Sequence, residues 1–201
     1  MMANPEIAEL ERQIADLTAK LNELRRQAPG RPVPNYGFAT LSGEVTLLDL
    51  FAGRDKLLAI HNMGQGCRYC TLWADGFNGL LGHLEDAMAV VLLSKDAPAV
   101  QRDFANSRNW RFRLASHGGG DYIREQTVMK DAENMPGAVV YERQGDQVVR
   151  KNSCVFGPGD LYCAMWSLLG LAGMGEGEWT PQYRYWQRPE HMDDGGENLL
   201  Q

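Results

Sequence analysis

The sequence predicts an α/β fold in which a mixed central sheet lies between layers of helices. Between residues 56 and 115, apolar runs of strand length alternate with segments of helical pattern, as in parallel strands joined by helices. Two later strand-like runs flank Gly145-Asp146, a strong hairpin signal, so we expect the end of the sheet to be antiparallel. Cys67 and Cys70 follow the first buried run, where a helix is expected to begin.

Composition and charge narrow the class of protein. The 201 residues suffice for one domain with extensions, and 44% hydrophobic and 23% charged residues are ordinary for a globular protein. The net charge of −6 argues against binding to nucleic acid or to an anionic membrane. No apolar run has membrane-spanning length, and the charged N-terminus has no signal core. Four cysteines do not suggest a disulfide scaffold, so we expect a cytoplasmic protein with reactive thiols.

The chain divides into a helical segment over residues 1–30, an α/β domain over 31–178 and an aromatic tail over 179–201. Asn4 is placed to cap the first helix, and Pro5 suits its first position. Residues 5–27 carry a heptad pattern suited to two-stranded packing, made by Ile7, Leu10, Ile14, Leu17, Leu21 and Leu24. Fewer than three heptads are marginal for a free coiled coil, so two interpretations stay open: a homodimer through residues 5–27, or a helix packed on its own domain.

The remaining elements follow in order along the chain. Gly30–Pro34 is expected to be a linker, because glycine and proline break the helix. Strands are expected at 38–41, 45–48, 56–61, 88–93 and 110–115, and at 138–142 and 147–151 in the hairpin. Helices are expected at 67–84, 97–107 and 161–171, and residues 118–134 are expected to be irregular.

The order of these parts resembles the thioredoxin fold. A strand ending in His61 precedes Gly66-Cys67-Arg68-Tyr69-Cys70, and Leu72-Trp73-Ala74-Asp75-Gly76-Phe77 follows. This pattern is similar to an uncharacterised, mostly bacterial thioredoxin-like family, a domain of unknown function within the thioredoxin/peroxiredoxin-like superfamily. The resemblance runs from about Pro5 to the Trp- and Tyr-rich tail. It implies a thioredoxin-like three-layer sandwich and does not imply a particular reaction.

The resemblance also assigns a role to Met135 and Pro136, which stand directly before the hairpin. In thioredoxin-like proteins a proline at this place is usually cis, faces the dithiol and offers a backbone edge to an extended disulfide substrate. The alternative is a trans proline that starts a strand, a position that suits a residue without an N–H.

The dithiol is the main candidate for chemistry. A cysteine at a helix N-terminus is stabilised as thiolate by free N–H groups and by the helix dipole, and a second cysteine three residues on lies within disulfide reach. We therefore predict that Cys67 attacks and Cys70 resolves, with Arg68 lowering the pKa of the Cys67 thiol. The alternative is that both cysteines are structural or idle.

Three other residues are weaker candidates. His61 stands where thioredoxin has a buried acid, so it is either a proton carrier for Cys70 or a hydrogen-bonded core residue. Cys154 follows the hairpin and is either a third redox thiol or a small buried residue. Cys163 lies in the apolar run of the last helix and is expected to be core. Asp75 is expected to make structural hydrogen bonds.

The sequence thus predicts a cytoplasmic thiol–disulfide oxidoreductase that acts on a protein or low-molecular-weight disulfide, or on a peroxide, without a bound cofactor. A zinc site is disfavoured because the two cysteine pairs lie far apart and histidines are few. The alternative, from another class, is a non-catalytic thioredoxin-like binding and dimerisation module whose dithiol is idle or a redox switch.

Overall fold

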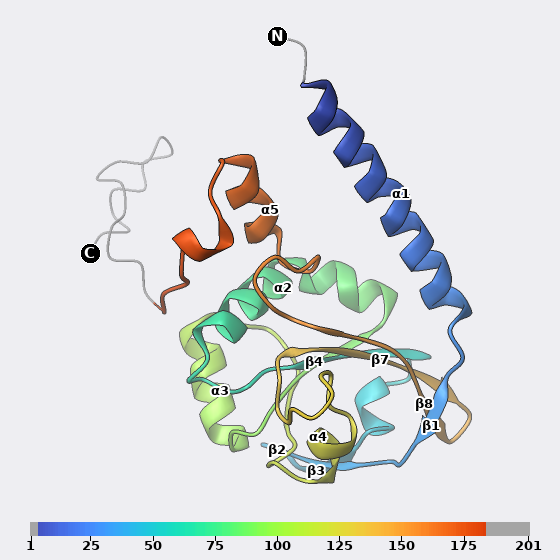
Figure 1. Cartoon of the computed structure of the whole chain (residues 1–201). Coiled ribbons are helices and arrows are strands. Elements are labelled where there is room, and N and C mark those ends of the chain that lie inside the picture. Colours follow the sequence, from blue (N-terminus) through green and yellow to red (C-terminus); the bar gives the residue numbers. More distant parts are fainter. Residues whose placement is uncertain (1–3, 184–201) are drawn as a thin grey trace.

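The computed structural model describes residues 4–183, which form one domain with a projecting N-terminal helix (Figure 1). The helices are α1 (Pro5–Gln27), α2 (Arg68–Ala87), α3 (Pro98–Ser107), α4 (Asp121–Glu125) and α5 (Ala164–Leu171), with 3-10 turns η1 (Asp49–Phe51) and η2 (Glu176–Glu178). The strands are β1 (Arg31–Val33), β2 (Gly37–Thr40), β3 (Gly43–Thr46), β4 (Lys56–His61), β5 (Ala89–Ser94), β6 (Leu114–Ser116), β7 (Gly137–Gln144) and β8 (Gln147–Val155).

All of these strands belong to one mixed sheet of order β1-β8-β7-β4-β5-β6-β2-β3. The β4–β5 and β5–β6 pairs are parallel, and α2 and α3 are the helices that connect them. β7 and β8 form the antiparallel hairpin that the Gly145-Asp146 turn predicts. β7 also pairs antiparallel with β4. The predicted mixed α/β fold is therefore confirmed.

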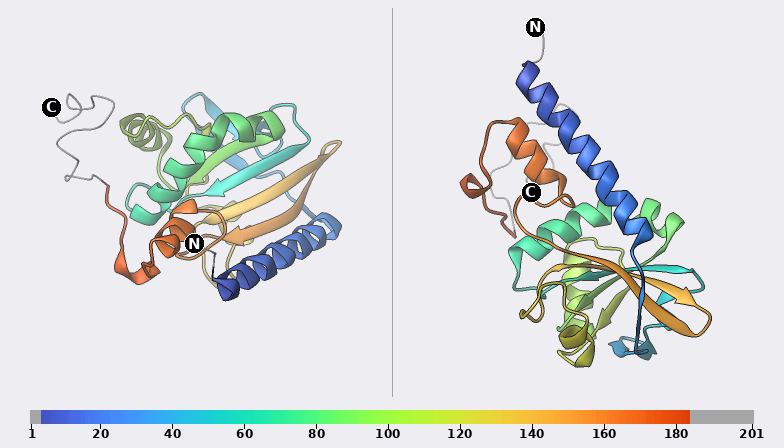
Figure 2. Two further views of the ribbon diagram at one scale, coloured as in Figure 1. Left: turned by 90° about the horizontal axis from the view of Figure 1, so that it is seen from above. Right: turned by 45° about the vertical axis from the view of Figure 1, so that its right-hand side comes forward.

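The two faces of the sheet carry separate cores. Alternate residues of β4 and β5, such as Ile60 and Val90, pack with residues of α2, α3 and α5. Their neighbours Ala59 and Val91 point the other way and pack with residues of η1 and α4. Helical elements thus cover both faces, which gives the predicted three layers, visible edge-on in Figure 2.

Three local expectations are wrong, besides the shifted ends of β3, β8 and α5. The expected linker contains β1, where Pro32 pairs with Val149 at the edge of the sheet. The strand expected at 110–115 is shorter and starts at Leu114, because the Trp110 indole is held by the Asp75 carboxylate of α2. The irregular segment 118–134 contains α4, whose Tyr122 is buried beneath the sheet.

Helix α1 has its predicted bounds, with Asn4 Oδ1 accepting the Glu6 N–H at 3.0 Å and Pro5 at its first turn. Figures 1 and 2 show it extending away from the sheet, and none of its residues is buried. Its last turn is hydrogen-bonded to the domain, from Arg25 to the Tyr162 hydroxyl and from the Asn152 amide to the Arg25 carbonyl. Five of the six heptad residues are therefore exposed rather than packed on their own domain, and Leu21 is partly buried.

The aromatic tail is described only in part. Trp179 packs edge-on against Trp166 of α5, with ring centroids 6.3 Å apart. Tyr185 and Trp186, which belong to the predicted aromatic tail, lie outside the described residues.

All peptide bonds among residues 4–183 are trans, so Pro136 is a trans proline that precedes β7. Its carbonyl accepts the Phe156 N–H at 2.9 Å and so joins the hairpin ladder.

Candidate dithiol site

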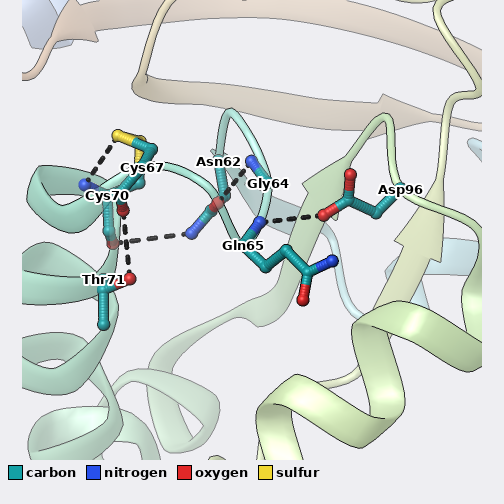
Figure 3. Close-up of a disulfide and its surroundings, with 7 residues drawn as sticks. All are labelled: Asn62, Gly64, Gln65, Cys67, Cys70, Thr71 and Asp96. Atoms are coloured by element: carbon teal, nitrogen blue, oxygen red, sulfur yellow. Dashed lines mark hydrogen bonds between the residues drawn. A yellow bond between two sulfur atoms is a disulfide. The ribbon is translucent and has the colours of Figure 1, made fainter. Parts of the chain in front are cut away.

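The dithiol lies where β4 passes into α2. The strand ends at His61, the loop 62–66 follows, and Cys67 is the cap residue of α2. Cys67 and Cys70 form a disulfide with their Cα atoms 5.2 Å apart, as the spacing of two cysteines across one helical turn allows. Figure 3 shows this pair beside the loop that leads from the strand.

The two cysteines differ in exposure and in hydrogen bonding. Cys67 is half-buried, while Cys70 is only 3% exposed. The Cys67 sulfur accepts the Cys70 backbone N–H at 3.1 Å, and Thr71 donates its hydroxyl to the Cys67 carbonyl at 3.0 Å. A thiolate at Cys67 would keep that N–H and lie at the positive end of α2. Cys67 is thus the accessible sulfur and Cys70 the sheltered one.

Asn62 and Asp96 hold the loop in place, and sequence reasoning missed both. The Asn62 amide lies 3.5 Å from the Cys70 carbonyl, and its oxygen accepts the Gly64 N–H at 2.8 Å. Asp96, in the turn after β5, accepts the Gln65 N–H at 2.9 Å. Figure 3 shows the two side chains on either side of the loop. An asparagine directly after a strand is a turn signal, whereas Asp96 is distant in sequence.

An open hollow borders the dithiol. Its volume is about 490 Å³, and its lining is Met63, Gly66, Cys67, Arg68, Tyr69, Lys95 and Asp96. Its charged lining residues are Arg68, Lys95 and Asp96, so the surface beside the Cys67 sulfur carries a net positive charge. Such a surface favours the thiolate form of a cysteine and the approach of anionic or polar substrates. Arg68 is exposed at the first turn of α2, as expected.

His61 lies on the other side of the sheet from the dithiol. Its Nε2 is 2.8 Å from the Tyr122 hydroxyl, within the core that excludes α2. Burial lowers the pKa of His61 to about 3, with a further contribution from the charge of His117, so the imidazole is neutral. Its ring thus contacts Tyr122 and not the dithiol, and the residue that approaches Cys70 is the next one, Asn62.

A chain of hydrogen bonds starts at His61 and runs through the core that contains Ala59 and Val91. Tyr122 is hydrogen-bonded to Tyr141 at 3.2 Å, and Tyr141 to Gln126 at 3.3 Å. Gln126 is hydrogen-bonded to Tyr36 at 2.9 Å, and Tyr36 to Glu125 at 2.6 Å. Burial raises the pKa of Tyr141, so the phenols stay protonated and serve as hydrogen-bond donors. The position of His61 in this chain matches the hydrogen-bonded core interpretation.

The remaining predicted residues are placed as follows. The pairing of Gly137 with His61 aligns Pro136 with Asn62, at the same end of the sheet as the dithiol. Contrary to expectation, Cys154 does not follow the hairpin but lies within β8, where it pairs with Ala138. It lines a separate apolar cavity, and burial raises the pKa of its thiol. Cys163 is a buried residue before α5. Cys154 and Cys163 are both free thiols.

Among residues 4–183, no cluster of three or more His, Cys, Asp or Glu side chains is arranged to bind a metal ion. In the same range, no helix combines the length and the apolar character needed to cross a membrane.

Comparison with known proteins identifies a family and a fold. A family model described as a bacterial protein of unknown function (DUF899) matches residues 2–192. Reduced Prx3 of Vibrio vulnificus, solved in complex with hydrogen peroxide, superposes with a TM-score of 0.54 at 18% identity, over 72% of this chain and 98% of its own. AhpC of Enterococcus faecalis gives 0.52 at 12% identity, over 72% and 90%. No curated protein matches the chain. The fold is thus that of the peroxiredoxin- and thioredoxin-like proteins.

Proposed function

This chain belongs to the DUF899 family of bacterial proteins of unknown function, and from its dithiol site we propose that it is a thiol–disulfide oxidoreductase. The observation that carries the proposal is the pair itself. A half-buried Cys67 caps a helix at an open, positively lined hollow, and a sheltered Cys70 lies within bonding distance. A structural disulfide has no need of an accessible sulfur beside two cations.

In the reduced protein, the Cys67 thiolate attacks one sulfur of a substrate disulfide. The substrate S–S bond breaks, a mixed disulfide forms at Cys67, and the first substrate thiolate leaves and takes up a proton. Cys70 then loses its proton and attacks the Cys67 sulfur, which closes Cys67–Cys70 and releases the second substrate thiol. Two electrons pass from the dithiol to the substrate, and an external dithiol must reduce Cys67–Cys70 again.

A peroxide is the other substrate class that this site suits. The Cys67 thiolate attacks one peroxide oxygen, the O–O bond breaks, and an alcohol or water leaves while Cys67 becomes a sulfenic acid. Cys70 then attacks that sulfur, water leaves, and the same disulfide results. In both cases Cys70 attacks the Cys67 sulfur and the same disulfide results, but the group that leaves is a thiol after a disulfide substrate and water after a peroxide.

The roles of the neighbouring residues follow from their positions. The α2 N-terminus, Arg68 and Lys95 are proposed to lower the pKa of the Cys67 thiol. Asn62 and Asp96 keep the loop rigid, so that the sulfur stays at the helix end. Met135 and Pro136 remain the proposed segment for an extended substrate, because Pro136 is aligned with Asn62.

The decisive experiment combines a redox titration with trapping. Purified protein is equilibrated in glutathione buffers, alkylated and analysed by mass spectrometry, and we expect a reversible Cys67–Cys70 couple. With glutathione disulfide as probe, Cys70→Ser should retain one glutathione at Cys67, whereas Cys67→Ser should retain none. Cysteines that stay reduced in oxidising buffer, or equal adducts on both variants, would refute the proposal and leave a non-catalytic module on a redox fold.

A further inference from the structure

The heptad residues of α1 form an exposed apolar seam. Five of the six are between 53 and 66% exposed: Ile7, Leu10, Ile14, Leu17 and Leu24. A row of large apolar side chains on a free helix is unusual for a soluble monomer and marks a contact surface. Most of the stability of helices in proteins comes from packing of an apolar face rather than from helix propensity. The exposed seam of α1 therefore indicates a partner that covers it.

The charges beside the seam tell which orientation a second helix would take. With Ile7 at the first core position, the flanking positions hold Glu6 and Glu11 near the start of the helix and Lys20 and Arg25 near its end. In a parallel pair, the residue before the first core position of a heptad on one helix faces the residue after the second core position of the same heptad on the other helix. Glu6 would then face Glu11, and Lys20 would face Arg25, so both contacts would be repulsive.

An antiparallel pair removes this conflict. The acidic start of one helix then lies beside the basic end of the other, so Glu11 approaches Arg25 of the second copy. The apolar spacing fits the same arrangement, since it is symmetric about the middle of the helix. Ile7 meets Leu24 of the second copy, Leu10 meets Leu21, and Ile14 meets Leu17.

We propose that α1 pairs antiparallel with α1 of a second copy of this chain, to form a two-fold symmetric dimer. A membrane surface is the less suitable partner, because interfacial helices are rich in Lys and Arg, whereas α1 holds five acidic and four basic residues. The proposal concerns α1 alone and does not depend on the chemistry of the dithiol.

In the antiparallel arrangement, the start of the second helix lies near the end of α1 that borders an apolar cavity. A cavity of about 310 Å³ opens beside the last turn of α1, and its lining includes Arg25, Leu80, Cys154 and Tyr162. Arg25 donates to the Tyr162 hydroxyl at 2.5 Å and forms no ion pair among the described residues. The acidic first turn of the second copy would approach this turn and supply the missing opposite charge.

The first test is the mass of the full-length protein in solution, by sedimentation or light scattering. We expect a dimer for the wild-type chain and a monomer for Leu17→Glu, which puts a charge at the centre of the seam. Leu17 is 66% exposed in the structure, so this variant should fold normally. Ala19→Glu, on the outward face, adds the same charge and should stay dimeric. A wild-type chain that is monomeric at its highest soluble concentration would overturn the proposal.

The second test decides the orientation by the sign of one effect. In an antiparallel dimer, Glu11→Lys places a lysine beside Arg25 of the second copy and should raise the dimer dissociation constant about tenfold. In a parallel dimer the same lysine would face Glu6 and lower that constant. Glu9→Lys makes the same charge change on the outward face and serves as control. Tighter dimerisation of Glu11→Lys would therefore refute the antiparallel arrangement.

Discussion

At the scale of single residues, Gly64 links the dithiol loop to the turn after β5. Its φ of +106° is a conformation that side chains disfavour, and an added Cβ would lie 2.6 Å from the Asp96 carboxylate. We expect Gly64→Ala to lower the free energy of unfolding by about 1–3 kcal/mol and to change the rate at which dithiothreitol reduces Cys67–Cys70.

The matched control for this loop is Gly66→Ala. Gly66 has no positive φ, and an added Cβ there would meet no atom within 4 Å. Its unfolding free energy, measured in urea, should stay close to that of the wild-type chain. Equal losses in the two variants would mean that the contact between Gly64 and Asp96 does not position the loop.

His61 should make stability depend on pH. Its folded pKa of about 3 lies below the ordinary value of 6.5, so between these values the unfolded chain binds the extra proton. Stability is therefore complete above pH 6.5 and falls as the solution is acidified. From pH 7 to pH 5, this one group should remove about 2 kcal/mol. Urea titrations at both pH values should show that loss reduced in His61→Gln; an unchanged loss would contradict the assignment.

The site residues that the sequence predicts are those whose chemistry is visible in the sequence itself. Cys67 and Cys70 are predicted because their spacing closes one helical turn at a recognisable strand–helix junction. His61 and Asn62 are harder, because neighbouring residues of a strand point to opposite faces. Which of the two approaches the dithiol depends on how the sheet is layered. The role of Asp96 has no signal in the neighbouring sequence, because its partner Gln65 lies in another loop, 31 residues earlier.

At the scale of elements, Asp75 joins α2 to the segment after α3. Its carboxylate accepts the Trp110 indole N–H at 2.7 Å and the Arg108 Nε–H at 2.9 Å, which confirms the predicted structural role. Asp75→Asn keeps an acceptor for one donor and loses the ion pair with Arg108. We expect a loss of about 1–3 kcal/mol in unfolding free energy, with thiol exchange at Cys67 unchanged. Unaltered stability would show that this junction does not hold the helices together.

Strands within the sheet were easier to predict than those at its edge. β4 has the predicted bounds because Lys56–His61 is a buried apolar run. Over residues 30–34, Pro32 and Pro34 predict a break in the chain, and only the pairing with β8 makes Arg31–Val33 a strand. Likewise α4 follows three glycines, and the burial of Tyr122 stabilises it. Local sequence patterns thus predict elements such as β4, whereas β1 and α4 form because of contacts with residues distant in the sequence.

At the scale of the whole molecule, the proposed dimer should tie thermal stability to protein concentration. Only the folded chain carries a paired α1, so mass action favours the folded state as concentration rises. We expect the melting temperature of the wild-type chain to increase across a concentration series, measured by calorimetry. Leu17→Glu should show no such increase. Melting temperatures of the wild-type chain that do not vary with concentration would contradict the dimer.

The overall fold was predictable where the functional surface was not. Alternating apolar runs and one hairpin turn determine the order of layers, because burial permits few arrangements of such elements. The hollow beside Cys67 depends instead on loops that meet only after folding, with Lys95 and Asp96 coming from the end of the next strand.

The short edge strand β1 has a further consequence. Pro32 occupies its centre and has no N–H to offer to another strand, whereas β8 beneath it has nine residues. Sheets with bare, regular edges recruit strands from other molecules, and proline on an edge blocks that growth. Truncations designed to remove α1 should therefore end before Arg31. A cut beyond Val33 would expose β8, and we expect such a protein to form fibrillar aggregates.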